Sequence, residues 1–247
     1  MPITNVHRGT RVDAIADNIY RISTPIAPNP GLPTGFTFNQ FLIVDDQPLL
    51  FHTGPRRMFP LVSEAVATVM PIERLRWVAF SHFEADECGA LNDWLTAAPA
   101  ATPVCSQVGA AVSVNDLAMR PARALADGEV LDTGNKRLRW LDTPHLPHGW
   151  DAGYLSELTT RTLFCGDLFT QPGATHEPVT EGDILGPSEV MRIASGYFCQ
   201  PRNAGPQLER LAATEPALLA CMHGASYRGD GSALLRQLAR TLAEGPA

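Results

Sequence analysis

Four side chains able to bind a metal ion lie within six consecutive residues, at His82, Glu84, Asp86 and Glu87. They follow the apolar run 77–80, which has the composition of a buried strand. A loop at the end of such a strand can present several side chains into one concave site. Imidazole and carboxylate ligands together suit iron, manganese or zinc. The same composition also fits an exposed polar loop that carries no site.

More candidate ligands stand where later apolar runs end. His145 and His148 follow one run, Asp167 closes a second and His223 closes a third. An imidazole or carboxylate at the end of a buried strand is costly to desolvate unless it is paired or bound to a metal. Each residue alone also fits an ordinary hydrogen-bonded turn. Because such residues recur at strand ends after the first cluster, we expect all of them to lie in one site.

Predicted strands and helices alternate around these candidates. Runs of apolar, β-branched and aromatic residues predict strands at 19–22, 36–44, 49–51, 77–80, 103–105, 138–141, 153–158, 162–165 and 217–221. Helical spacing of apolar residues predicts helices at 59–70, 89–97, 206–213 and 232–244. The segment 173–196 is rich in Gly, Pro and Asp and predicts a long loop, of the kind that often forms a site wall. Two sheets packed between helices, in one domain over residues 1–247, fit this order.

The composition excludes several classes of protein. Of the 247 residues, 45% are hydrophobic and 18% are charged, as in folded globular domains. A net charge of −7, without a run of Lys or Arg, argues against nucleic-acid binding. There is no signal-peptide pattern and no run of the roughly 20 apolar residues that span a membrane. The five cysteines form no paired motif, so we expect a soluble cytoplasmic protein with reduced thiols.

The order of the candidate residues resembles that of the metallo-β-lactamase superfamily. Ser81-His82-x-Glu84-x-Asp86 is followed by His148-Gly149-Trp150-Asp151, then by Gly166-Asp167 and His223-Gly224. The pattern is most similar to the diiron domain of flavodiiron proteins and to single-domain oxygen-binding diiron proteins. It covers the chain from about Tyr20 to Gly224. The resemblance implies an α/β fold (α+β by some schemes), built as a four-layer αβ/βα sandwich with two metals at its edge.

The resemblance also implies a role for each candidate ligand. One metal ion would be bound by His82, Glu84 and His148, the other by Asp86 and His223, and Asp167 would bridge them. Asp86 and Asp167 would be the catalytic residues. His148 is preferred to His145 because it precedes the Gly-Trp-Asp segment that resembles the family.

Two positions depart from the family pattern. Glu87 stands where the family often has histidine, and it could be a ligand, a hydrogen-bond acceptor beside the ligands, or neither. His52 stands where aspartate is usual. That position normally supports the site, so we expect His52 not to bind metal.

Glu84 decides which metal we expect. Hydrolytic members of the superfamily usually have histidine there and bind zinc. A carboxylate favours iron, with zinc or manganese as alternatives. We therefore expect a diiron protein that binds or reduces dioxygen or a related small oxidant. The chain ends at Ala247 without room for a flavodoxin domain, so it would hold no flavin and a reductase would take electrons from a separate partner.

Two other functions are left open. In a metal-dependent hydrolase of the same fold, the metals would activate water against an ester, thioester, amide or phosphodiester, with Asp86 orienting the water. A non-enzymatic binding module that has lost its metals would fit the departures at Glu87 and His52. The residues also leave open whether the protein is an enzyme and whether it forms a homo-oligomer.

Overall fold

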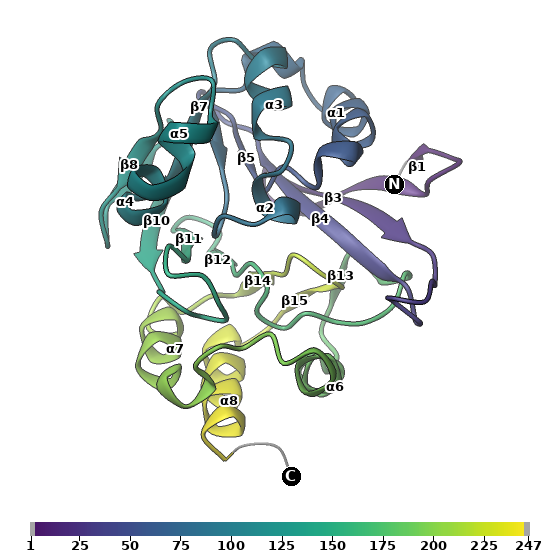
Figure 1. The fold of residues 1–247 in the computed structure, drawn as a ribbon, viewed down its shortest axis with the longest axis vertical. Helices are drawn as coiled ribbons and strands as arrows, with labels where there is room; N and C mark the ends of the chain where they lie inside the picture. The colour runs from purple at the N-terminus through teal and green to yellow at the C-terminus, as the bar shows by residue number, and fades with distance from the viewer. Residues whose placement is uncertain (1–2, 245–247) are drawn as a thin grey trace.

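The computed structural model, which describes residues 3–244, has two β-sheets that face each other and helices on both outer faces (Figure 1). Among the described residues, the first sheet has eight strands in chain order: β1 (Ile3–Asn5), β2 (Thr10–Ala16), β3 (Ile19–Ile26), β4 (Phe36–Ile43), β5 (Leu49–Phe51), β6 (Trp77–Ala79), β7 (Thr102–Ser106) and β8 (Arg123–Leu125).

The second sheet has seven strands within the same described range, in the spatial order β13-β15-β14-β12-β11-β10-β9. In chain order they are β9 (Val130–Asp132), β10 (Arg137–Asp142), β11 (Gly153–Glu157), β12 (Thr162–Phe164), β13 (Val179–Thr180), β14 (Leu218–Ala220) and β15 (Ser226–Arg228). Together with the helices on either side, the two sheets confirm the expected four-layer αβ/βα sandwich.

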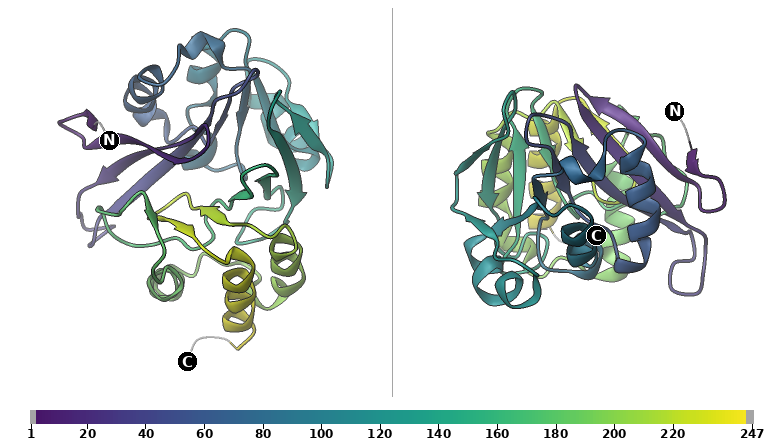
Figure 2. Two further views of the ribbon diagram at one scale, coloured as in Figure 1. Left: turned by 180° about the vertical axis from the view of Figure 1, so that it is seen from behind. Right: turned by 90° about the horizontal axis from the view of Figure 1, so that it is seen from above.

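The helices cover the two sheets in separate groups. The first sheet is covered by α1 (Phe59–Ala67), α2 (Ala85–Cys88), α3 (Leu91–Ala97) and the helical segment made of α4 (Gln107–Gly109), a π-helical turn (Ala110–Val114) and α5 (Asn115–Leu117). The second is covered by α6 (Leu185–Ser195), α7 (Gly205–Ala212) and α8 (Gly231–Glu244). Figure 2 shows this division from behind, with the purple and blue part of the chain opposite the yellow and light-green part. No helix among the described residues has the length and apolar character needed to cross a membrane.

Side chains that alternate along the strands form the core. Phe41 and Phe51 point between the sheets and meet Phe164, at ring-centroid distances of 5.5 and 5.4 Å. Leu42 and Leu50 point to the opposite face and pack under the helices of the first sheet. Because successive side chains of a strand point to opposite faces, strands buried on both sides read as continuous apolar runs. This is why the sequence predicts β5 and the last three residues of β4 well.

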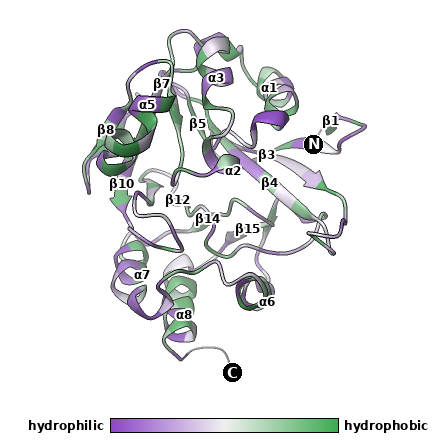
Figure 3. Ribbon diagram, in the orientation of Figure 1, coloured by the Kyte–Doolittle hydropathy of each residue, from purple (hydrophilic) through white to green (hydrophobic). Residues whose placement is uncertain are grey.

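The helices over the second sheet are amphipathic. Leu235, Leu238 and Leu242 of α8 are buried, at the spacing of one helix face. Figure 3 shows hydrophobic and hydrophilic residues alternating along α7 and α8. The structure thus confirms the helices predicted at 206–213 and 232–244.

The prediction of a long loop over 173–196 is wrong, because this segment contains β13 and the helix α6. The carboxylate of Asp183 accepts hydrogen bonds from the backbone N–H groups of Leu185 and Gly186, at 2.9 and 3.0 Å. Pro187 lies in the first turn, where a backbone N–H has no partner within the helix. The Gly, Pro and Asp residues that predicted a loop are therefore part of a helix start.

Strands of both sheets end at one shared edge. β6 of the first sheet ends three residues before His82. In the second sheet β12 and β14 run parallel, with Phe164 opposite Ala220. Asp167 and His223 each lie three residues beyond that pair, so both leave the sheet on the same side. Candidate ligands from distant parts of the sequence therefore meet at this edge.

Candidate metal centre

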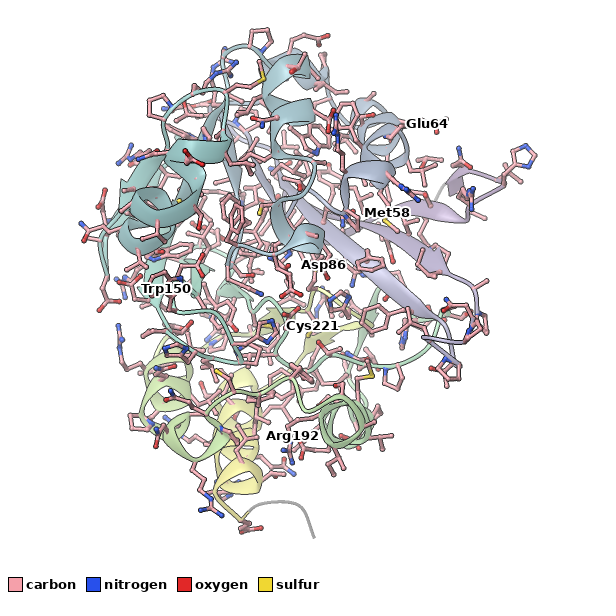
Figure 4. All side chains as sticks on the ribbon, in the orientation of Figure 1. Met58, Glu64, Asp86, Trp150, Arg192 and Cys221 are labelled. Carbon is pink, nitrogen blue, oxygen red and sulfur yellow. The ribbon has the colours of Figure 1, made fainter. Side chains whose placement is uncertain are left out.

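Seven donor side chains converge at the edge between the two sheets. Donor atoms that lie within 4.8 Å of one another form a first group, made of His82, Glu84, His148 and Asp167, and a second group, made of Asp86, Glu87 and His223. Figure 4 shows Asp86 between the upper and lower halves of the molecule, above Cys221.

Glu84 lies at the middle of the first group. Its Oε2 is 3.0 Å from Nε2 of His82 and 2.9 Å from Nε2 of His148, and these two nitrogens are 3.0 Å apart. Oδ2 of Asp167 is 3.3 Å from Nε2 of His148 and 3.7 Å from that of His82. Ligands bound to one ion at about 2.1 Å in tetrahedral geometry lie roughly 3.4 Å from each other. The spacing of the four donor atoms fits a shared metal ion.

Asp167 faces both groups with different oxygens. Its Oδ1 is 3.3 Å from Nε2 of His223, and Oδ2 of Asp86 is 3.4 Å from the same nitrogen. Although it is buried, this Oδ1 has no hydrogen-bond partner among the described protein groups. A carboxylate with one oxygen toward each group has the placement that a bridge between two ions requires.

Two histidines present Nε2 to the centre because Nδ1 has another partner. Nδ1 of His148 lies 2.9 Å from the carbonyl oxygen of Tyr197, and Nδ1 of His223 lies 2.8 Å from that of Thr37. A carbonyl oxygen can only accept, so each Nδ1 donates a proton and each Nε2 of the neutral ring keeps a lone pair. Such partners fix the orientation of metal-binding histidines.

His82 is held by a buried chain of hydrogen bonds. Its Nδ1 is 3.0 Å from Oγ of Ser81, which is 3.1 Å from Nε2 of His52. When Nδ1 of His82 donates to the Ser81 hydroxyl, that hydroxyl can donate onward to His52. Burial lowers the pKa of His52 to about 3, so its ring is neutral and Nε2 can accept. His52 therefore acts on His82 through Ser81 and belongs to neither donor group.

Glu87 is fully buried in α2 and lies beside Asp86 and His223. Neither of its carboxylate oxygens has a hydrogen-bond partner among the described protein groups. Burial, with the charges of Asp167 and Asp86, raises the pKa of Glu87 well above its usual value. Because burying an unpaired carboxylate is costly, this position fits a bound cation.

The charges of the centre also shift the pKa values of its other members. Hydrogen bonds from His148 and His82 lower the pKa of Glu84 to about 2. Burial alone lowers the pKa of His148, but the nearby carboxylates, Glu84 foremost, raise it to about 9. For His223 the effect of burial is outweighed in the same way by Asp167 and Asp86, which raise the pKa to about 10. Metal ions would displace these imidazole protons on binding.

Comparison with known proteins identifies the family. A family model described as "ODP family beta lactamase" matches residues 36–224, which include all seven donor side chains. The chain belongs to the ODP family. The match confirms the resemblance to the metallo-β-lactamase superfamily.

Relatives of this ODP chain carry the names of flavoproteins and of an oxygen oxidoreductase. The putative diflavin flavoprotein A 3 of Nostoc is 30% identical over 142 residues, which are 56% of this chain and 24% of the relative. Rubredoxin-oxygen oxidoreductase of Megalodesulfovibrio gigas is 24% identical over 208 residues, which are 80% of this chain and 50% of the relative. The chain therefore spans between a quarter and a half of the length of these two relatives.

A solved structure confirms the fold of this ODP chain. A mutant of the flavo di-iron protein from Thermotoga maritima superposes with a TM-score of 0.85 at 16% identity, over 97% of this chain and 63% of that protein. At this level of identity the likeness concerns the fold alone.

A cavity of about 190 Å³ opens onto the centre of this ODP chain. Five of the donor residues line it, together with Phe36, Thr170, Met191, Ser195 and Tyr197. Met191 and Ser195 belong to α6. The segment predicted as a loop therefore does form a wall of the site, but as a helix.

In this ODP chain the structure brings together the six residues predicted as ligands and also Glu87, whose role the sequence leaves open. His145 is exposed and lies outside both groups, so His148 alone of that pair contributes. Sequence reasoning included Ser81 in the motif but did not predict its hydrogen bond to His82. It also missed the Thr37 carbonyl, which no sequence pattern indicates because it is a backbone atom of a distant strand.

Proposed function

We propose that this ODP chain holds two iron ions and binds or reduces dioxygen or a related small oxidant. The observation that carries the proposal is the position of Glu84, whose carboxylate lies between the imidazoles of His82 and His148. The two donor groups together contain four carboxylates and three imidazoles. Such a hard, anionic set suits iron better than an imidazole-rich zinc site would. The name of the flavo di-iron protein supports the choice of iron, and the name of the rubredoxin-oxygen oxidoreductase supports oxygen as the oxidant.

The proposed ligands follow the two donor groups. His82, Glu84 and His148 would hold one ion, Asp86, Glu87 and His223 the other, and Asp167 would bridge them. The unpartnered oxygens of Glu87 and Asp167 and the outward-facing Nε2 atoms support this assignment. We propose Asp86 and Asp167 as the catalytic residues because each faces the Nε2 atom of His223 at the centre.

When bound, two ferrous ions supply electrons to a small oxidant. The protein holds the ligands in place and lines the space above them. Burial raises the pKa of Tyr197, so its hydroxyl stays protonated beside the cavity. Phe36 and Met191 give the same cavity apolar walls that limit the entry of water. The Tyr197 hydroxyl donates to the backbone carbonyl of Asp167 at 3.3 Å, and a small apolar molecule can approach the centre beside it.

The size of the cavity supports a small ligand. Its volume is about 190 Å³. Pockets for drug-sized molecules are usually roughly 300–1,000 Å³. A diatomic oxidant fits this space.

We propose that residues 3–244 form one metal-binding domain, and we assign no flavin site within it. The strands and helices of residues 3–244 all belong to the two sheets or to the layers that cover them. If the protein is a reductase, its electrons would reach the centre from outside these described layers. The centre itself does not require two copies of the chain to associate, because all seven donors come from one chain. A homo-oligomer remains compatible with the proposal.

Anaerobic reduction followed by exposure to air tests the proposed function. Iron-loaded protein should develop an absorption band between the near ultraviolet and the visible when oxygen enters. The matched zinc-loaded protein should show no such change. An iron-loaded protein whose spectrum does not respond to oxygen would contradict the proposal. Turnover of an ester or lactam by the zinc form, lost in Asp86→Ala, would replace it with the hydrolase function.

A further inference from the structure

The two donor groups differ in charge. Apart from the shared Asp167, the first group has the imidazoles of His82 and His148 and one carboxylate, Glu84. The second group has one imidazole, from His223, and two carboxylates. The second position therefore carries one more negative charge and one fewer neutral donor than the first. Glu87 is the residue that creates this difference.

The backbone fixes the place of Glu87. Its carbonyl oxygen accepts a hydrogen bond of 2.7 Å from the backbone N–H of Thr53, just beyond the end of β5. The backbone N–H of Cys88 donates to the carbonyl of Glu84 at 2.9 Å, which closes the turn of α2. Both contacts hold the backbone of Glu87 against the first sheet, which keeps its side chain at the centre.

Among residues 3–244, Glu87 has neither a side-chain hydrogen bond nor an ion pair with a Lys or Arg. Its side chain is fully buried, and neither oxygen has a hydrogen-bond partner within residues 3–244. No Lys or Arg of the described chain forms an ion pair with it. Its closest donor neighbours are Asp86 and His223. A buried carboxylate with a second carboxylate beside it is stable only when a cation lies between them or a proton binds.

We propose that Glu87 is a ligand of the second position and that its charge gives the two positions different one-electron reduction potentials, the lower at the position with Glu87. The Coulomb energy of a carboxylate with a metal ion grows with the charge of the ion. Glu87 therefore stabilises a ferric ion more than a ferrous one. The inference rests on the proposed function, because it requires iron at both positions.

A redox titration of the anaerobic, iron-loaded protein tests the inference. Dithionite, which is oxidised to sulfite, supplies the electrons, and each electron converts one ferric ion to a ferrous ion. Electron paramagnetic resonance follows the half-reduced state, which has an odd number of electrons. We expect the wild type to be reduced in two separate steps, with a large half-reduced signal between them.

The variant Glu87→Gln keeps the size of the side chain and removes its charge. We expect the lower of the two potentials to rise and the maximum of the half-reduced signal to fall. The control Glu64→Gln makes the same change in net charge on α1, far from the centre (Figure 4). It should leave both potentials unchanged.

A second measurement covers the case in which the variant does not retain both ions. Metal-free Glu87→Gln should unfold at a higher temperature than the metal-free wild type, because it no longer buries an unpaired acid. Loss of one of the two iron ions from this more stable variant would also support Glu87 as a ligand. A metal-free variant that is less stable than the wild type would show a structural role and overturn the proposal.

Different results would overturn the role of Glu87 and the proposed function. Two iron ions that are reduced together, without a half-reduced signal and with the same potentials in Glu87→Gln, overturn the inference alone. A wild-type protein that takes up no iron contradicts the proposed function.

Discussion

At the scale of single residues, the centre depends on the hydrogen-bond partners that orient the ligands as much as on the ligands themselves. Thr37 and Tyr197 fix two of the histidines through backbone carbonyls. Ser81 and His52 fix the third through side chains. The ligand types can be predicted from sequence, because they stand at strand ends. Their supports cannot, since a hydrogen bond between His52 and Ser81 depends on how β5 and β6 lie side by side.

The hydrogen-bond chain behind His82 gives a prediction at this scale. Ser81→Ala removes the acceptor of Nδ1 of His82 and leaves the donor groups intact. Loss of such a partner typically weakens metal binding by about 10–100-fold. Competition with a chelator measures this loss. Ser63→Ala, on α1 and away from the centre, is the matched control. Equal affinity in the two variants would show that the chain does not position His82.

At the scale of elements, the buried strands and amphipathic helices are predictable because each has a clear apolar pattern. β2 is not, because Arg11 and Asp13 interrupt its apolar residues. Asp13 is buried only because Arg11 and Arg21 lie beside it, at 2.8 and 3.9 Å. The helix α6 is missed for a similar reason. Its start uses Asp183 and Pro187, residue types that in isolation predict a loop.

A contact between the sheets gives a prediction at this second scale. Asp45, just after β4, accepts hydrogen bonds from Thr133, Asn135 and Lys136, which lie between β9 and β10. Burial of Asp45 would raise its pKa, but these hydrogen bonds outweigh it and lower the pKa to about 2. Asp45→Asn should lower the free energy of unfolding by about 1 kcal/mol at neutral pH, a modest value because Asp45 is only half-buried.

The pH dependence of Asp45→Asn follows from the direction of this shift. The pKa of Asp45 is lower in the folded state than in the unfolded chain, so its contribution to stability is complete above the unfolded value. The difference in free energy of unfolding between wild type and variant should therefore decrease as the pH falls from about 4 through about 2. Urea denaturation at several pH values measures it, with Asp46→Asn as control. A difference that stays constant over this range would contradict the assignment.

At the scale of the whole molecule, the centre joins the two halves of the sandwich. His82, Glu84, Asp86 and Glu87 follow a strand of the first sheet. The remaining donors, His148, Asp167 and His223, follow strands of the second sheet. A metal pair would therefore stabilise the packing of one sheet on the other. The sequence predicts the two-sheet architecture from the order of its elements, but it cannot show which side chains meet across the sheets.

Metal-linked stability is the prediction at this scale. An ion that binds only the folded state stabilises it by about 2.7 kcal/mol when its free concentration is about 100 times its Kd. Calorimetry should therefore show a Tm that rises with iron concentration, in one transition for the whole domain. Asp167→Ala removes the residue that faces both groups and should abolish most of the rise. A Tm that does not depend on iron in the wild type would mean that the ions do not link the two halves.

The central claim is that the seven donors select a pair of iron ions. Metal analysis of protein purified anaerobically from cells supplied with both iron and zinc tests this claim most directly. We predict that iron approaches two ions per chain and that zinc is a minor component. Zinc near two ions per chain, with little iron, would contradict the account.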